Sequence, residues 1–190
     1  MTLRLITAPT TQPVTLAEAK AHLRVELDDD DTLITAMIIT ATQAAEHATG
    51  RVLMLQTWEA GFDAFSDPLV LTRVPVQSVT SLTYVDAVGT LQTLSADLYQ
   101  LTKDDFGFAR ITPVYGTSWP ALRGDVDGVK VRYVAGYTSA NDVPQAIKSW
   151  MLLHCGSQHA NRESETVGSG SAISLTFADA LLHPYKVYDI

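Results

Sequence analysis

Residues 31–50 read DTLITAMIITATQAAEHATG, and this stretch decides the fold. Its apolar residues recur every three or four positions, which is the period of one face of an α-helix. They are Leu33, Ile34, Met37, Ile38, Ala41, Ala44, Ala45 and Ala48. Gly50 is typical of the residue that follows a helix, because glycine adopts the left-handed conformation without strain. The sequence therefore predicts a long helix from about Asp31 to Thr49.

Two further helical patterns flank this stretch at a distance. Thr15 and Glu18 have the spacing of a capping box, which predicts a short helix ending near Val25. Later in the chain, Pro144 suits the first turn of a helix, where its missing amide costs nothing. That helix is expected over residues 144–161. The sequence thus predicts three main helices that form a small bundle.

Between these helices the apolar period changes from about 3.6 to two. Val129, Val131 and Tyr133, for example, alternate with Lys130 and Arg132. Pairs such as Asp-Pro and Asp-Gly punctuate the segment at intervals typical of turns between short strands. The pattern predicts an α+β fold. Its helical body comprises residues 1–50 and 138–162, and an antiparallel β subdomain of five to seven strands is inserted at residues 51–137.

The end of the chain differs from the rest in composition. Residues 163–171 are small and polar, which predicts a flexible linker. Residues 172–190 are rich in large apolar side chains, and a segment of about twenty residues does not build a core of its own. The segment therefore either folds back or docks on another molecule. We expect a docking tail that begins as an alternating strand and ends in an aromatic hook.

The residues predicted to dock on a partner protein or on a neighbouring subunit are the large side chains of this tail and one lysine. They are Ile173, Leu175, Phe177, Leu181, Leu182, Pro184, Tyr185, Lys186, Val187 and Tyr188.

Composition bounds the function. The 190 residues include 21 acidic and 13 basic side chains, for a formal charge of -8. Such a surface repels phosphate backbones and anionic lipid, so neither nucleic acid nor membrane binding is expected to drive its interactions. The single cysteine, Cys155, excludes an internal disulfide and a multi-cysteine metal site. We expect a soluble protein that is not secreted.

No group of residues has the pattern of a catalytic, cofactor or metal site. The four aspartates at 28–31 lack the central glycine and closing glutamate of a calcium loop, and their charge suits the start of the following helix. Cys155 and His154 are adjacent in sequence, so they point about 100° apart on a helix. His154 and His159 are five positions apart rather than the four that bring ligands together. We interpret these residues as structural.

Several segments together are similar to one known family. Residues 14–25 read VTLAEAKAHLRV and residues 44–51 read AAEHATGR. Residues 131–137 read VRYVAGY, and residues 181–187 read LLHPYKV. In this order they resemble the head-tail connector proteins of tailed bacteriophages, also called adaptor or head-completion proteins. An arginine is common in that family where this chain has Lys186.

The resemblance implies a structural, non-enzymatic virion protein of the neck, made in the host cytoplasm, with no cofactor. It implies a homo-oligomeric ring, expected to hold twelve copies, beneath the portal protein. The implied partners are the portal, a stopper or tail-terminator protein, and genomic DNA that passes through the channel without specific contacts. Two alternatives stay open: a small hydrolase or transferase using His154, Cys155 or the aspartates at 28–31, and a monomeric ligand-binding β module.

Overall fold

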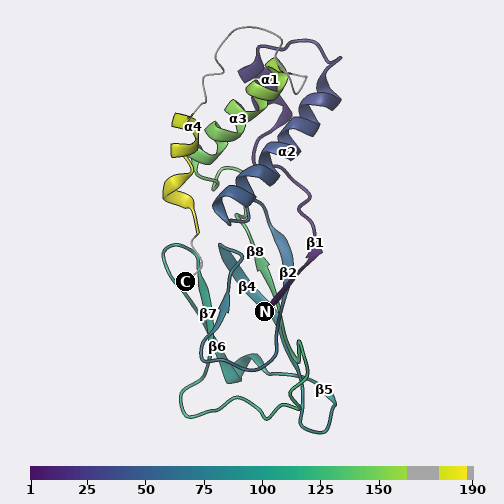
Figure 1. Ribbon diagram of the computed structural model, residues 1–190, viewed down its shortest axis with the longest axis vertical. Helices are drawn as coiled ribbons and strands as arrows, with labels where there is room; N and C mark the ends of the chain where they lie inside the picture. Colours follow the sequence, from purple (N-terminus) through teal and green to yellow (C-terminus); the bar gives the residue numbers. More distant parts are fainter. Residues whose placement is uncertain (162–175, 188–190) are drawn as a thin grey trace. The chain divides into compact units, whose positions relative to one another are not determined.

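The computed structural model describes residues 1–161 and 176–187 (Figure 1). The chain forms two compact units, and each contains more than one stretch of the sequence. The β unit comprises Met1–Thr10 and Leu55–Gly136, and the helical unit comprises Thr11–Met54 and Tyr137–Ile190. Helices and antiparallel sheets are both present, so the predicted α+β class is confirmed.

The larger sheet of the β unit has five antiparallel strands in the order β1-β2-β8-β4-β5. Their bounds are β1 (Thr2–Thr7), β2 (Gln56–Phe62), β4 (Val76–Val85), β5 (Leu91–Thr93) and β8 (Val129–Ala135). A three-stranded sheet has the order β3-β7-β6. The bounds of its strands are β3 (Leu69–Leu71), β6 (Tyr99–Lys103) and β7 (Ala109–Pro113). The short helix η1 (Ala96–Leu98) directly precedes β6.

The central strand β8 shows why the alternating sequence forms this sheet. Val129, Val131 and Tyr133 are fully buried, whereas Lys130 and Arg132 between them are exposed. The alternation continues onto the neighbouring strands, because Ala60 of β2 and Leu82 of β4 both pair with Val131 and are also fully buried. One face of the five-stranded sheet therefore forms the core of the β unit.

The first strand corrects the predicted domain boundary. We expected residues 1–50 to lie in the helical body, but β1 pairs with β2, and Met1–Thr10 belongs to the β unit. All six residues of β1 are exposed, so the strand carries no buried alternation that a sequence pattern would reveal. Backbone hydrogen bonds to β2 hold β1 in place. Every residue other than proline can form such bonds, so the side-chain pattern does not reveal them.

The helical unit contains α1 (Leu16–Leu23), α2 (Asp31–Thr49), α3 (Gln145–Ala160), α4 (Thr176–Ala180) and the short helix η2 (His183–Tyr185). The predicted capping box is present at α1, where the Thr15 hydroxyl accepts from the Glu18 amide and the Glu18 carboxylate accepts from the Thr15 amide at 2.7 Å. Helix α2 has the predicted bounds, and Gly50 follows it with a φ of 70°. The short α4 adds a fourth helix to the three predicted ones.

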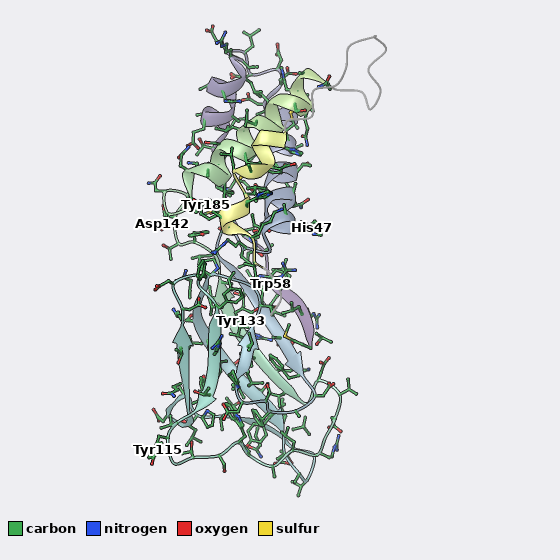
Figure 2. All side chains as sticks on the ribbon, turned by 60° about the vertical axis from the view of Figure 1, so that its left-hand side comes forward. His47, Trp58, Tyr115, Tyr133, Asp142 and Tyr185 are labelled. Atoms are coloured by element: carbon green, nitrogen blue, oxygen red, sulfur yellow. The ribbon has the colours of Figure 1, made fainter. Side chains whose placement is uncertain are left out.

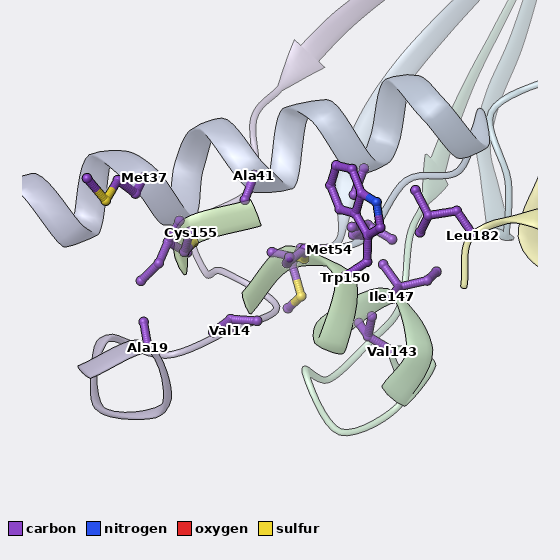
Figure 3. Close-up of a cluster of buried hydrophobic side chains, with 14 of the residues drawn as sticks. Val14, Ala19, Met37, Ala41, Met54, Val143, Ile147, Trp150, Cys155 and Leu182 are labelled. Atoms are coloured by element: carbon purple, nitrogen blue, oxygen red, sulfur yellow. The ribbon is translucent and has the colours of Figure 1, made fainter. Parts of the chain in front are cut away.

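The core of the helical unit lies where α2 and α3 meet (Figure 3). Helix α2 buries Ile34, Met37, Ile38 and Ala41, and α3 buries Ile147, Trp150, Met151 and Cys155. Within the described parts of the chain, none of the helices combines the length and apolar character that crossing a membrane requires.

Candidate assembly site

Residues 176–187, here called the closing segment, pack on the helical unit of their own chain. Leu182 is 1% exposed and Ala178 is 6% exposed, and both belong to the apolar cluster of α2 and α3. Figure 3 shows Leu182 near Ile147 and Trp150 of α3. These apolar contacts remove from water a side chain whose burial contributes about 1.5–3 kcal/mol.

Three hydrogen bonds fix the same segment. The Trp150 indole Nε1 donates to Oδ1 of Asp179 at 3.2 Å. The Nε of Arg51 donates to the carbonyl oxygen of Tyr185 at 2.8 Å, and the amide of Val187 donates to the carbonyl oxygen of Thr49 at 2.7 Å. The last two bonds give a donor to the carbonyl groups of Tyr185 and Thr49, which would otherwise have to bond to water.

These contacts correct two expectations about the tail. We predicted that the segment begins as an alternating strand, but Thr176–Ala180 is a helix. Leu181 and Leu182 follow Phe177 and Ala178 by four residues, which is the spacing of one helix face. The alternation that predicted a strand was shorter than this helical pattern. We also expected the apolar residues to need a second molecule, whereas Leu182 is buried in the core of its own unit.

The ten predicted docking residues therefore have different places. Leu181 and Tyr185 are half-buried and pack against the helical core, Pro184 is exposed, and Lys186 and Val187 are half-buried. Phe177 lies in α4. Ile173, Leu175 and Tyr188 are outside the described residues, as is the predicted linker at 163–171. A docking role for the accessible residues stays a prediction.

Sequence reasoning missed the residues that receive the closing segment. Arg51 is only 7% exposed, and Gly50 leaves so little space that a Cβ atom there would lie 3.1 Å from Cβ of Val187. The sequence offered one signal for this site, an arginine directly after the glycine that ends a helix. An arginine buried at such a position requires hydrogen-bond acceptors close by.

Sequence reasoning also missed several exposed apolar side chains of the β unit. Large apolar residues in its loops and on β5 are 63–101% exposed; they are Val88, Leu91, Phe106, Tyr115 and Val126. Figure 2 shows Tyr115 at the tip of one of these loops. Strand β1 adds Leu3, Leu5 and Ile6, which are 36–42% exposed. Large apolar groups concentrated on exposed segments are typical of surfaces that contact other proteins.

The aspartates of the candidate acidic site contact other side chains of the same chain. Lys20 Nζ lies 2.6 Å from Oδ1 of Asp28 and 2.7 Å from Oδ1 of Asp31. The hydrogen bond from Lys20 lowers the pKa of Asp28. His159 Nε2 is 3.7 Å from Oδ2 of Asp30. No cluster of three potential metal ligands occurs in the residues that the structure describes.

The candidate nucleophile, Cys155, is buried. Cys155 is 1% exposed, and burial raises the pKa of its thiol to about 11, which disfavours the reactive thiolate. His154 stacks on Trp150 with ring centroids 5.0 Å apart, and its Nε2 is 3.0 Å from Nε2 of Gln158. Burial lowers the pKa of His154. Both residues thus serve the packing of α3.

The comparison with known families bears on both units. Residues 13–84 match the phage gp6-like head-tail connector protein family. The resemblance to head-tail connector proteins is thereby confirmed over this range, which runs from the residues before α1 into β4. A search of curated proteins gives no match.

Solved structures of gene transfer agent particles contain chains that share the fold along the whole chain. The neck of an empty gene transfer agent particle, computed with C6 symmetry, has a chain with a TM-score of 0.81 and 23% identity. A chain of the native gene transfer agent virion gives 0.78 and 21%, and a chain of the native neck, computed with C12 symmetry, gives 0.77 and 22%. Each likeness covers 100% of this chain and 97% of the other.

Proposed function

We propose that this chain is a structural neck protein of a phage-like particle, a head-tail adaptor located in the virion. One observation carries the proposal: the likeness to neck chains spans all of this chain and nearly all of theirs, so both units are shared. The match of residues 13–84 to head-tail connector proteins supports the same role.

The adaptor is a homo-oligomeric ring, of twelve copies if it follows the C12 symmetry of the native neck. It lies beneath the portal, receives a stopper or tail-terminator protein on its other side, and lines a channel for DNA. A ring requires two different surfaces that fit each other on neighbouring copies. The exposed apolar residues of β1 and of the β-unit loops supply such surfaces. A net charge of -8 allows DNA to pass without strong binding.

The closing segment contributes a docking surface for the portal or a neighbouring copy. Leu182 anchors the segment in the helical core, and Pro184, Lys186 and Val187 remain accessible beside it. Lys186 presents a point charge rather than the planar fork of an arginine, so its contact with a carboxylate is not bidentate.

The role is non-enzymatic. Cys155 is buried and its thiol has a raised pKa, and the aspartates at 28 and 31 are paired with Lys20. A hydrolase using these groups would need a thiolate or a free carboxylate in an accessible pocket.

The test is particle assembly in the cells that produce the particle. Loss of this chain should leave DNA-filled heads without tails, and the unmodified chain should restore tailed particles. Cys155→Ala and Asp28→Asn should restore them equally well, because neither group acts chemically. Tailed, infectious particles formed without this chain would contradict the proposal.

A further inference from the structure

The outward side of α2 carries no aspartate, glutamate, lysine or arginine. Residues 32–48 of this helix contain one such residue, Glu46, whose carboxylate accepts from the amide of Leu53 at 2.8 Å. The exposed residues away from the buried side form the α2 outer face, which comprises Thr32, Leu33, Ala36, Ile39, Gln43 and His47. Leu33 and Ile39 are 38% and 40% exposed. A helix whose outward side meets only water normally has charged residues there.

The outward side of α3 has the same character. Residues 145–160 contain one charged residue, Lys148, which is 8% exposed and whose Nζ lies 2.8 Å from Oε1 of Glu18 in α1. Trp150 bonds to Asp179 of α4. Between the sides that meet α1 and α4 lies the α3 outer face, which comprises Ala146, Ser149, Leu153, Ser157 and Ala160. The spacing of three or four residues puts these side chains on one side of the helix.

The two outer faces match each other in charge, length and side-chain size. Residues 32–47 span about 22 Å and residues 146–160 about 21 Å, at about 1.5 Å per residue. The α2 outer face projects Leu33 and Ile39, whereas the α3 outer face offers mainly small residues, which let two helices approach closely. Because α2 and α3 pack against each other through their buried sides, the outer faces point to different sides of the helical unit. A ring requires two such different surfaces.

We infer that the α2 outer face of one copy packs against the α3 outer face of the next copy around the ring. This inference rests on the proposed function, which places a second copy beside each one. It adds a contact of the helical units to those of the β units. Nucleic acid is not the occupant, because neither face has a basic residue for phosphate. Loss of charge around exposed leucine and isoleucine is typical of the buried centre of a protein interface.

The symmetry of the ring gives the direction of this contact. Helices α2 and α3 of one chain are antiparallel, since His159 near the end of α3 lies 3.7 Å from Asp30 before the start of α2 (Figure 1). In a ring with C12 symmetry, neighbouring copies differ by a rotation of 30° (360° divided by 12), which turns a helix by no more than that angle. The contact between copies is therefore antiparallel as well. With the two faces aligned end to end, Gln43 lies opposite Ser149.

Cross-linking in isolated necks tests this contact. With Gln43→Cys and Ser149→Cys in the same chain, a short bis-maleimide should convert most of the monomer band into a ladder up to the full ring. Only links between copies produce a ladder. Cys155 is 1% exposed, so it does not contribute. Absence of a ladder would overturn the inference.

The matched control keeps Ser149→Cys and moves the other cysteine to Thr32→Cys. Both Thr32 and Gln43 lie on the α2 outer face, but they are about 16 Å apart along the helix, at about 1.5 Å per residue. No ladder is expected from the control pair. Ladders of equal yield from both pairs would show that the contact is not the antiparallel pairing of the two faces, and would overturn the inference.

The reactivity of Gln43→Cys alone gives a second readout. Its thiol should react with a small maleimide about tenfold more slowly in the neck than in the free subunit, because the centre of a protein interface excludes solvent. Equal rates would show that the α2 outer face meets solvent in the ring, as a wall of the DNA channel does. That result would overturn the inference.

The mass of the intact neck separates this inference from the proposed function. A ring of this chain that gives no ladder contradicts the pairing of the two outer faces and leaves the adaptor role standing. Necks that contain no copies of this chain contradict the adaptor role itself.

Discussion

Trp150 of α3 donates a hydrogen bond to Asp179 of α4, and this bond links the buried face of α3 to that short helix. The two residues are 29 positions apart in sequence. Trp150 is 8% exposed and packs in the helical core, so the bond connects a rigid group to the closing segment.

Removing this bond should loosen the closing segment without unfolding the helical unit. Asp179→Ala and Trp150→Phe each break it, and we expect each to lower the free energy of unfolding by about 1–3 kcal/mol, because a bond to a charged group is lost. The double variant should cost less than the sum, since both changes remove one interaction. Limited proteolysis near residue 180 measures the loosening, and strictly additive losses would show that the two groups are not coupled.

Leu182 should be the residue of the closing segment on which stability depends most. Leu182→Ala leaves a cavity at a position that is 1% exposed, and we expect a loss of about 2–5 kcal/mol. The neighbouring His183 is exposed, so His183→Ala is the matched control, with an expected change within about 0.5 kcal/mol. Denaturant unfolding followed by far-ultraviolet circular dichroism gives both values. Equal losses would mean that the segment is not docked in solution.

Gly50 and Gly116 form a matched pair for the contact with Val187. Both have positive φ, at 70° and 82°, so alanine at either position costs about 1–2 kcal/mol in backbone strain. A Cβ at Gly50 also lies 3.1 Å from Cβ of Val187, whereas a Cβ at Gly116 meets nothing within 4 Å. Gly50→Ala should therefore speed cleavage of the closing segment by proteases, and Gly116→Ala should not. Equal cleavage rates would argue against the Val187 contact.

Acid should weaken the link between α1 and α3. Hydrogen bonds from Lys148 and from the Thr15 amide lower the pKa of Glu18 from 4.5 to about 2. A carboxyl group with a lowered pKa stabilises the fold above its unfolded pKa, and this contribution is lost as the pH falls toward the folded value. The melting temperature should thus fall between about pH 5 and pH 2, and fall less in Glu18→Gln. Identical pH profiles for the two proteins would contradict this assignment.

Cys155 should be almost inert in the native protein. Its pKa is raised from 9.0 to about 11, which lowers the thiolate fraction about 100-fold, and the side chain is 1% exposed. A disulfide reagent at neutral pH should react with it only after denaturant is added. Rapid reaction of the folded chain would reopen the possibility of a cysteine nucleophile.

The elements that the sequence predicted are those whose burial follows a clear period. Helix α2 buries residues every three or four positions, and β8 buries every second residue, so their side chains record their surroundings. Strand β1 was not predicted, because its residues are all exposed and its position depends on backbone pairing with β2. Sequence periods report burial, and they contain no record of pairing between exposed strands.

For the closing segment, the sequence predicted burial but not the surface that receives it. Its excess of apolar residues correctly indicated that Leu182 must be buried. The sequence did not reveal which surface receives it, because that surface combines Thr49, Arg51 and Trp150 from distant parts of the chain. Burial of a side chain is a local property, but the identity of its neighbours depends on the whole fold.

The strand order also determines when the sheet is completed during synthesis. Strand β8 lies between β2 and β4, although it is the last of the five to leave the ribosome. Until residue 135 has emerged, the nascent chain holds two incomplete halves, β1 with β2 and β4 with β5, whose inner edges are both unsatisfied. We expect translation products that stop short of that residue to aggregate more readily than the complete chain.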